Sequence, residues 1–214
     1  MGPKMTKISV EVDPLLLEAG QCFMYLLWVE SMMCDLMALR EGGQALVDRY
    51  NTAYGTGSNP SAFSKKRLEI KSLTFAKIRD RFFGLWPQWQ HENSIRESIE
   101  RAVILRNAFS HAQVQPFRNY LLYNPTSWDS INRHMKCGRC LNYLGNCNCS
   151  KVDLAEPRCL KLDSMVVDGA YEDIKEIDRN CLFPTAVNMG VRYRGIAWPN
   201  EIGGFEIAEN RIGV

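Results

Sequence analysis

The sequence of 214 residues lacks several features that would place it directly in a class of proteins. No stretch reaches the roughly 18 uncharged apolar residues of a transmembrane helix. The longest apolar run, Cys22–Val29, lies between Glu18 and Glu30. Residues 1–13 are polar and basic, without the apolar core of a secretory signal. We therefore expect a cytoplasmic protein with no membrane partner.

The chain also lacks a strong excess of charge. Its net charge is only +2, which argues against a protein that coats DNA constitutively but is compatible with a local basic surface. We find no internal repeat and no glycine-rich phosphate loop. The composition, 46% hydrophobic and 23% charged, is that of a folded domain rather than a disordered chain. The length fits one fair-sized domain, with or without a small module.

What the chain does contain is a series of helical patterns. The first helix is expected from about Pro14 to Glu41, because Asp13 can cap it and Gly42-Gly43 ends it. A loop is expected over residues 51–60, and a second helix over residues 64–83. The first helix is rich in methionine and is expected to be mostly buried. The methionines are interpreted as side chains that fill the core: Met24, Met32, Met33 and Met37.

A third helix is expected from residues 91–93 to about residue 112, and it carries an arginine in its apolar stripe. Arg106 falls in the middle of the side formed by Ile95, Ile99, Ala102 and Phe109. A buried guanidinium keeps its charge and needs a carboxylate, a phosphate or a water-filled pocket. Asn107 and His111 are four residues apart and therefore lie side by side on another face. An arginine, an amide and an imidazole on one turn suit chemistry on a phosphate.

The same helix is apolar on nearly every side from Ala102 to Phe109. A helix of this kind is buried on all sides, which a small domain achieves with difficulty. A partner chain is a natural cover. The pattern therefore predicts a homodimer formed through the motif-bearing helix.

Arg106, Asn107, three variable residues and His111 resemble the signature of the HEPN superfamily. The resemblance covers about residues 14–118 and implies an all-helical bundle that usually dimerises. Many HEPN proteins are metal-independent endoribonucleases with a composite site at the two-fold axis, and often act as toxins or defence effectors. Others have lost catalysis and bind nucleotides or partner proteins.

The resemblance thus implies an endoribonuclease that needs no cofactor for catalysis and, if it is a toxin, an antitoxin protein as partner. His111 would serve as base or acid, because histidine titrates near neutral pH. Arg106 would fork onto two phosphate oxygens, and Asn107 would orient His111 or bind the phosphate. The alternatives are a catalytically inactive HEPN module that binds nucleotide or a partner, and a zinc-stabilised interaction protein.

A structural interpretation of the same residues stays open. Arg106 would pair with Glu30 or Asp35 of the first helix. His111 would stabilise the C-terminal end of its own helix, where a positive charge is favoured.

The predicted second helix is basic, with seven positive and two negative side chains. It is either a solvated face or a track for an RNA backbone, in which phosphate contacts supply most of the affinity. The RNA-binding candidates are Lys65, Lys66, Arg67, Lys71 and Lys77. The turn after this helix contains Trp86 and Trp89, which are interpreted as core anchors rather than as base-stacking residues.

Six of the eight cysteines fall between residues 137 and 181. In a reducing compartment such a cluster suggests metal rather than disulfides. The best tetrad for a structural zinc ion is Cys137, Cys140, Cys147 and Cys149, and His134 or Cys159 could replace one of the last two. Free thiols, an iron–sulfur cluster and a redox dithiol are the alternatives. Cys22 and Cys34 are expected to be core thiols.

The C-terminal part has a different character. A loose alternation over residues 114–123 suggests a short strand or an extended return, and Asn124-Pro125-Thr126 marks a boundary. Residues 170–182 are expected to form an acidic helix with a solvated face, and the tail from Val187 to form irregular or short β structure. The predicted organisation is mainly α: a HEPN-like helical domain over residues 1–123, then a C-terminal region over 124–214 with a Cys-rich segment at 134–160.

Overall fold

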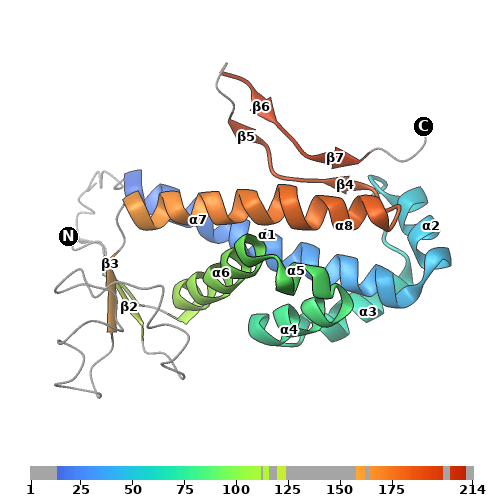
Figure 1. The fold of residues 1–214 in the computed structure, drawn as a ribbon, viewed down its shortest axis with the longest axis horizontal. Helices are drawn as coiled ribbons and strands as arrows, with labels where there is room; N and C mark the ends of the chain where they lie inside the picture. Colours follow the sequence, from blue (N-terminus) through green and yellow to red (C-terminus); the bar gives the residue numbers. More distant parts are fainter. Residues whose placement is uncertain are drawn as a thin grey trace, which may run out of the picture.

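The computed structural model describes residues 14–111, 113–115, 120–123, 158–161, 164–199 and 203–210. Within these ranges the protein is mainly helical, with short strands after the motif-bearing helix and near the C-terminus (Figure 1). The mainly α class with short C-terminal β structure is therefore confirmed. The helices of the first half are α1 (Pro14–Gly42), α2 (Gln44–Ala53), α3 (Ser61–Lys71), α4 (Phe75–Leu85), α5 (Pro87–His91) and α6 (Asn93–His111).

Helix α1 has the predicted bounds to within one residue and is the central helix of the bundle. Met33 and Met37 are buried as predicted, whereas Met24 is 62% exposed. It ends where Gly43 adopts a φ of 74°, a conformation that glycine reaches without strain. By length and composition α1 is apolar enough to cross a membrane. Its apolar side chains pack instead against α3, α4, α6 and α7, and the core position accounts for the composition.

The predicted second helix is wrong as a single element. It is divided into α3 and α4 by a break at residues 72–74, because the hydroxyls of two residues there bond to the backbone. Ser72 donates to the Glu69 carbonyl at 2.7 Å, and the Thr74 side chain caps α4 by accepting from the Lys77 N–H at 3.4 Å. The sequence interpretation also missed α2, which runs into the start of the predicted loop. It missed the short α5 as well, which occupies most of the predicted turn and contains Trp89.

Helix α6 confirms the third predicted helix, and a small antiparallel sheet follows it. The sheet has the order β1 (Gln113–Gln115), β2 (Tyr120–Tyr123) and β3 (Arg158–Lys161), and the last pair of β2 and β3 is Tyr123 opposite Arg158. The expected strand or return at 114–123 is thus a pair of short strands. The boundary expected at 124–126 lies outside the described residues.

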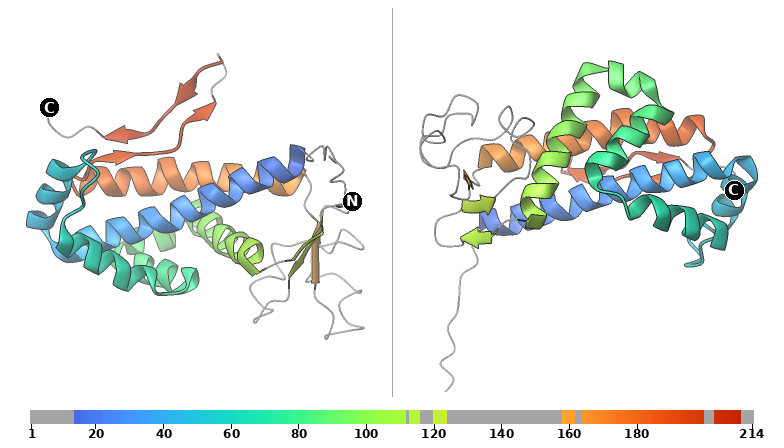
Figure 2. Two further views of the ribbon diagram at one scale, coloured as in Figure 1. Left: turned by 180° about the vertical axis from the view of Figure 1, so that it is seen from behind. Right: turned by 90° about the horizontal axis from the view of Figure 1, so that it is seen from below.

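After β3 the chain returns to the helical body. Helix α7 (Ser164–Ile177), the π-helical turn η4 (Asp178–Leu182) and α8 (Phe183–Asn188) form one continuous rod beside α1 (Figures 1 and 2). The acidic helix is present, but its expected solvated face is wrong for two residues. Asp173 and Asp178 are buried, whereas Glu172 is exposed.

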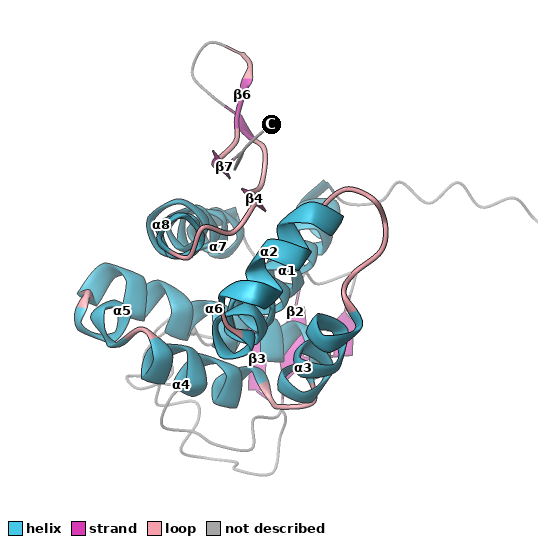
Figure 3. Ribbon diagram, turned by 90° about the vertical axis from the view of Figure 1, so that its right-hand side faces the viewer, coloured by secondary structure: helices cyan, strands magenta, loops and turns pink. Residues whose placement is uncertain are grey.

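The chain ends in short antiparallel strands that extend away from the helices, as the side view shows (Figure 3). They are β4 (Tyr193–Arg194), β5 (Trp198–Pro199), β6 (Phe205–Glu206) and β7 (Glu209–Asn210). Ile174, Ile177, Tyr193 and Trp198 belong to the same buried cluster as α1. Residues 164–198 therefore contribute to the core of the N-terminal helices, although the sequence analysis placed them in a separate C-terminal region.

Three cysteines lie in this core. Cys22 and Cys34 are fully buried as predicted, and Cys181, which the sequence grouped with the Cys-rich cluster, is fully buried as well. Burial raises the pKa of the Cys22 and Cys34 thiols to about 12, and it also raises that of Cys181 well above the usual range. All three are therefore neutral thiols at physiological pH.

These thiols predict how stability depends on alkaline pH. An unfolded chain ionises its thiols near 9.0, whereas the folded chain keeps Cys22 and Cys34 protonated up to about 12. Between these values only the unfolded state releases the protons, so stability should fall as pH rises from 9 toward 12. We expect the urea midpoint to decrease over this window, and to decrease less in a Cys22→Ala/Cys34→Ala variant. An equal slope in both proteins would contradict the assignment.

Candidate functional site

The Arg106 guanidinium lies against the carboxylate of Glu30, from the middle of α1. Its Nε donates to Glu30 Oε2 at 2.7 Å, and its Nη2 donates to Oε1 at 3.2 Å. The side chain of Glu30 is only 8% exposed and that of Arg106 is 21% exposed. This bidentate pair confirms that a carboxylate of the first helix neutralises the half-buried arginine. Asp35, the other expected partner, pairs with Arg67 instead.

The pair forms because α1 and α6 pack closely at this level. The rings of Phe23 on α1 and Phe109 on α6 have centroids 5.6 Å apart. The arginine that interrupts the apolar stripe of α6 is thus explained by the one acidic residue, Glu30, that is buried on α1.

Asn107 joins the same group. Arg106 Nη1 donates to Asn107 Oδ1 at 3.3 Å, and both side chains are half-buried. The structure therefore brings Arg106 and Asn107 together on the C-terminal half of α6.

His111 is the last residue of α6 and is exposed. It lies five residues beyond Arg106, which is about 140° around and about 7.5 Å along an ideal helix. The imidazole is placed at the negative end of the helix dipole, as the structural interpretation expects. Arg106 and His111 of one chain thus flank a short stretch of helix surface rather than meeting at one atom.

The apolar stretch of α6 that suggested a partner chain is covered largely by the protein's own helices. Ala102, Val103 and Ile104 are buried, and Leu105 and Phe109 are partly buried against the core. Helix α6 as a whole packs against α1, α4, α5 and α7.

The RNA-binding candidates of α3 and α4 divide into paired and exposed side chains. Arg67 donates to Asp35 and to Ser31 Oγ, and Lys66 forms an ion pair with Glu41 at 3.6 Å. Burial raises the pKa of the Asp35 carboxyl, and the nearby Arg67 opposes that shift. Within the described ranges, Lys65, Lys71 and Lys77 form no ion pair, and all three are exposed. Three of the five RNA-binding candidates therefore present charge to solvent.

The two tryptophans of the turn are structural, as interpreted from the sequence. Trp86 is buried, with its ring centroid 4.7 Å from that of Phe82. Trp89 Nε1 donates to Thr185 Oγ1 at 2.9 Å, which connects α5 to α8.

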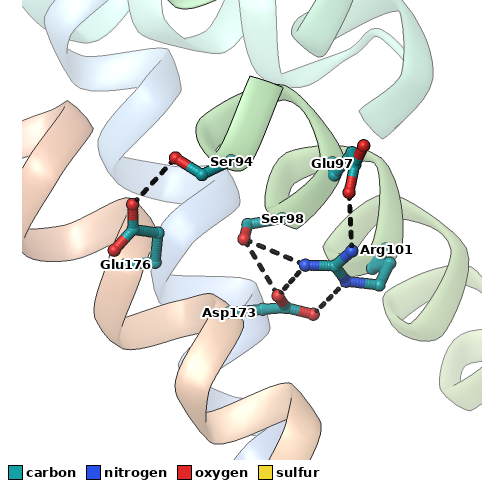
Figure 4. A network of polar contacts seen from close by, with 6 residues as sticks. All are labelled: Ser94, Glu97, Ser98, Arg101, Asp173 and Glu176. Carbon is teal, nitrogen blue, oxygen red and sulfur yellow. Dashed lines mark hydrogen bonds and ion pairs between the residues drawn. The ribbon is translucent and has the colours of Figure 1, made fainter. Parts of the chain in front are cut away.

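A second arginine of α6 forms a polar network that the sequence analysis missed. Arg101 donates from Nε to Asp173 Oδ2 at 2.8 Å and from Nη2 to Oδ1 at 2.5 Å, and Ser98 Oγ also donates to Asp173 Oδ1 (Figure 4). Glu97 contacts Nη1 of Arg101 at 3.5 Å. This network fixes α7 on α6. The one sequence signal for this network is Ser98, a polar residue within the apolar stripe of α6.

Asp178 is the other polar residue that the sequence analysis missed. Its carboxylate is fully buried and accepts from Tyr193 OH at 2.5 Å and from the Ile196 N–H and Trp198 Nε1 at 3.0 Å each. Gly195 lies so close that any Cβ there would collide with both carboxylate oxygens. The Asp178 carboxylate thus holds the C-terminal strands onto the rod at its π-helical turn.

The zinc candidates Cys137, Cys140, Cys147 and Cys149 lie outside the described residues, as does His134. For Cys159 only the backbone, in β3, is described. Among the residues that are described, no group of three or more metal-ligating side chains is found.

Comparison of the chain with protein-family models, with curated proteins and with solved structures found no match.

Proposed function

We propose that the protein is a metal-independent endoribonuclease of HEPN type. The observation that carries the proposal is the arrangement on α6 of Arg106 and Asn107 beside each other, with exposed His111 one turn further on. Phosphodiester cleavage without a metal requires a positive charge and a group that transfers protons. Here the arginine, held by a carboxylate, supplies the charge, the imidazole can transfer protons, and the amide is a further polar group beside them.

The cleavage proceeds by transesterification within the RNA strand. A base removes the proton of a 2′-hydroxyl, whose oxygen attacks the adjacent phosphorus, and the bond from phosphorus to the 5′-oxygen breaks. An acid returns a proton to the leaving 5′-oxygen. His111 supplies the base or the acid, and Arg106 stabilises the charge on the phosphorane oxygens. The products carry a 2′,3′-cyclic phosphate and a 5′-hydroxyl.

A homodimer would supply both proton-transfer groups. One His111 cannot act as base and acid at the same moment on opposite sides of one phosphate. Two copies of α6 related by a two-fold axis would contribute two His111 and two Arg106 to a single site. We propose this dimer as the active form. The exposed lysines Lys65, Lys71 and Lys77 would add contacts to the RNA backbone, and these contacts would weaken with salt.

One observation favours a second candidate, a catalytically inactive HEPN module that binds nucleotide or a partner. Glu30 occupies two donors of Arg106 and neutralises its charge. A purely structural Arg106 would leave His111 without its phosphate partner. The two candidates differ in a direct measurement of cleavage.

The test is incubation of the purified protein with a mixed RNA substrate in EDTA. We expect the wild type to cleave and His111→Ala to be slower by about 100-fold or more, because a proton-transfer group contributes about that much. His91→Ala is the matched control, since His91 is an exposed histidine at the end of another helix, α5. Its activity should equal that of the wild type, and all products should carry 5′-hydroxyl ends.

Other results would decide against the proposal. No cleavage by a folded wild-type protein would favour the inactive module. Equal cleavage by the wild type and His111→Ala would place the activity elsewhere or in a contaminant.

The remaining parts of the proposal rest on the sequence. Cys137, Cys140, Cys147 and Cys149 would hold a structural zinc ion, because four thiolates form a closed tetrahedral site without an open position for chemistry. A toxin or defence effector acting on cytoplasmic RNA, controlled by an antitoxin protein, is the biological setting that the HEPN resemblance suggests.

A further inference from the structure

Helix α1 contributes one side chain to the motif of α6, and the geometry of that contact is specific. Glu30 accepts from Nε and Nη2 of Arg106, which form one edge of the planar guanidinium. The contact leaves the other edge, which contains Nη1, directed to Asn107 Oδ1 at 3.3 Å. We call the edge held by the buried Glu30 carboxylate the inner edge and the edge that contains Nη1 the outer edge. The side chain of Arg106 as a whole is 21% exposed.

Arg101 shows what a purely structural arginine of the same helix does. Asp173 accepts from Nε and Nη2 of Arg101, as Glu30 does from Arg106. The outer edge of Arg101, however, meets a second carboxylate, because Glu97 lies 3.5 Å from its Nη1 (Figure 4). Both edges of Arg101 are therefore neutralised by acids. Among the described residues, the outer edge of Arg106 meets only a neutral amide, that of Asn107.

This difference matters for anion binding. A guanidinium with carboxylates on both edges has its positive charge balanced by acids, which reduces its attraction for a phosphate. A guanidinium with a carboxylate on its inner edge keeps its outer donors, and its orientation is fixed before the anion arrives. Fixed orientation contributes most when charge develops at a defined position, as on a phosphorane oxygen.

We propose that Glu30 is a positioning residue that aims the Nη1 edge of Arg106 at a phosphodiester. This inference rests on the proposed function. Glu30 itself touches no substrate, and it acts through the orientation of Arg106.

The test compares Glu30→Gln with Asp173→Asn, which breaks the equivalent ion pair of the same helix. Both substitutions keep the side-chain shape and remove one buried charge. The measurements are kcat and KM for RNA cleavage, thermal denaturation, and the Kd for a fluorescein-labelled 2′-O-methyl RNA, which lacks the attacking hydroxyl. Glu30→Asp is included as a variant that retains the charge.

We expect Glu30→Gln to lower kcat by about 10- to 100-fold, as misplacement of a catalytic group by about 1 Å does. Asp173→Asn should keep kcat within about twofold of the wild-type value. Its loss of thermal stability should be similar to that of Glu30→Gln. Glu30→Asp should recover part of the lost kcat. The Kd for the uncleavable RNA should rise in Glu30→Gln. Loss of a negative charge alone would strengthen RNA binding, so electrostatics without orientation predicts the opposite sign.

Each contrary outcome has a distinct meaning. If the wild type cleaves and Glu30→Gln has the kcat of Asp173→Asn, or a higher one, Glu30 is merely structural and the inference fails while the proposed function stands. If the wild type binds RNA without cleaving it, the proposed function fails, and the inference then stands or falls on whether Glu30→Gln binds more weakly. If the wild type neither cleaves nor binds RNA, both fail.

Discussion

Asp178→Ala should destabilise the protein by about 3–5 kcal/mol, because each buried donor left without an acceptor costs about 1–3 kcal/mol. The substitution leaves three donors without an acceptor in the core, the Tyr193 hydroxyl, the Ile196 N–H and the Trp198 indole. Each is buried, so each would carry the cost of lost hydration. The C-terminal strands would then detach from the rod formed by α7, η4 and α8.

Urea denaturation, followed by tryptophan fluorescence and circular dichroism, measures this effect. Glu172→Ala is the control, because Glu172 is an exposed acid of α7 and its loss should change stability by less than about 0.5 kcal/mol. A loss below about 1 kcal/mol for Asp178→Ala, well under the typical cost of breaking such a network, would show that the strands are held by apolar packing alone.

The second large effect concerns the pair at the motif. Arg106→Met should cost about 3 kcal/mol, because it leaves the buried Glu30 carboxylate without its cation. The double variant Glu30→Leu/Arg106→Met should recover most of that stability, since replacing both members by apolar side chains removes the unpaired charge. Cleavage should be lost in both proteins. Recovery of folding without recovery of activity would separate the two contributions of Arg106.

A double-mutant cycle on the thermal or urea midpoints gives the measurement. The single variant Glu30→Leu completes the cycle. If the double variant is as unstable as Arg106→Met, the buried carboxylate is not the cause of the loss, and the ion pair contributes little. If the double variant still cleaves RNA at the wild-type rate, Arg106 has no part in the reaction.

The elements predicted well from the sequence are those with local signals. Helix α1 has a proline start and a glycine end, and α6 has a clear apolar stripe, so both were placed within about two residues. The pairing of Arg106 with Glu30 was foreseen as one of two options, because a buried arginine requires an acid and α1 offers few.

The features that were missed depend on residues distant in the sequence. The burial of Asp178 follows from Tyr193 and Trp198, whose strands have no periodic pattern. The burial of Asp173 follows from Arg101, 72 residues earlier. The acidic residues of a helix are predicted to face solvent unless the residues that pair with them can be identified. The break between α3 and α4 depends on two hydroxyl groups whose preference for the backbone competes with a helical pattern that would otherwise continue.

The small sheet beside α6 has a consequence for how the chain can vary. Strands β2 and β3 are antiparallel neighbours, and Tyr123 lies directly opposite Arg158. The chain therefore leaves and re-enters the helical body at adjacent points. The entropic cost of closing a loop between such points rises only slowly with its length. Between Tyr123 and Arg158 a segment can therefore be lengthened, shortened or exchanged for another during evolution without changing the path of α6 into α7.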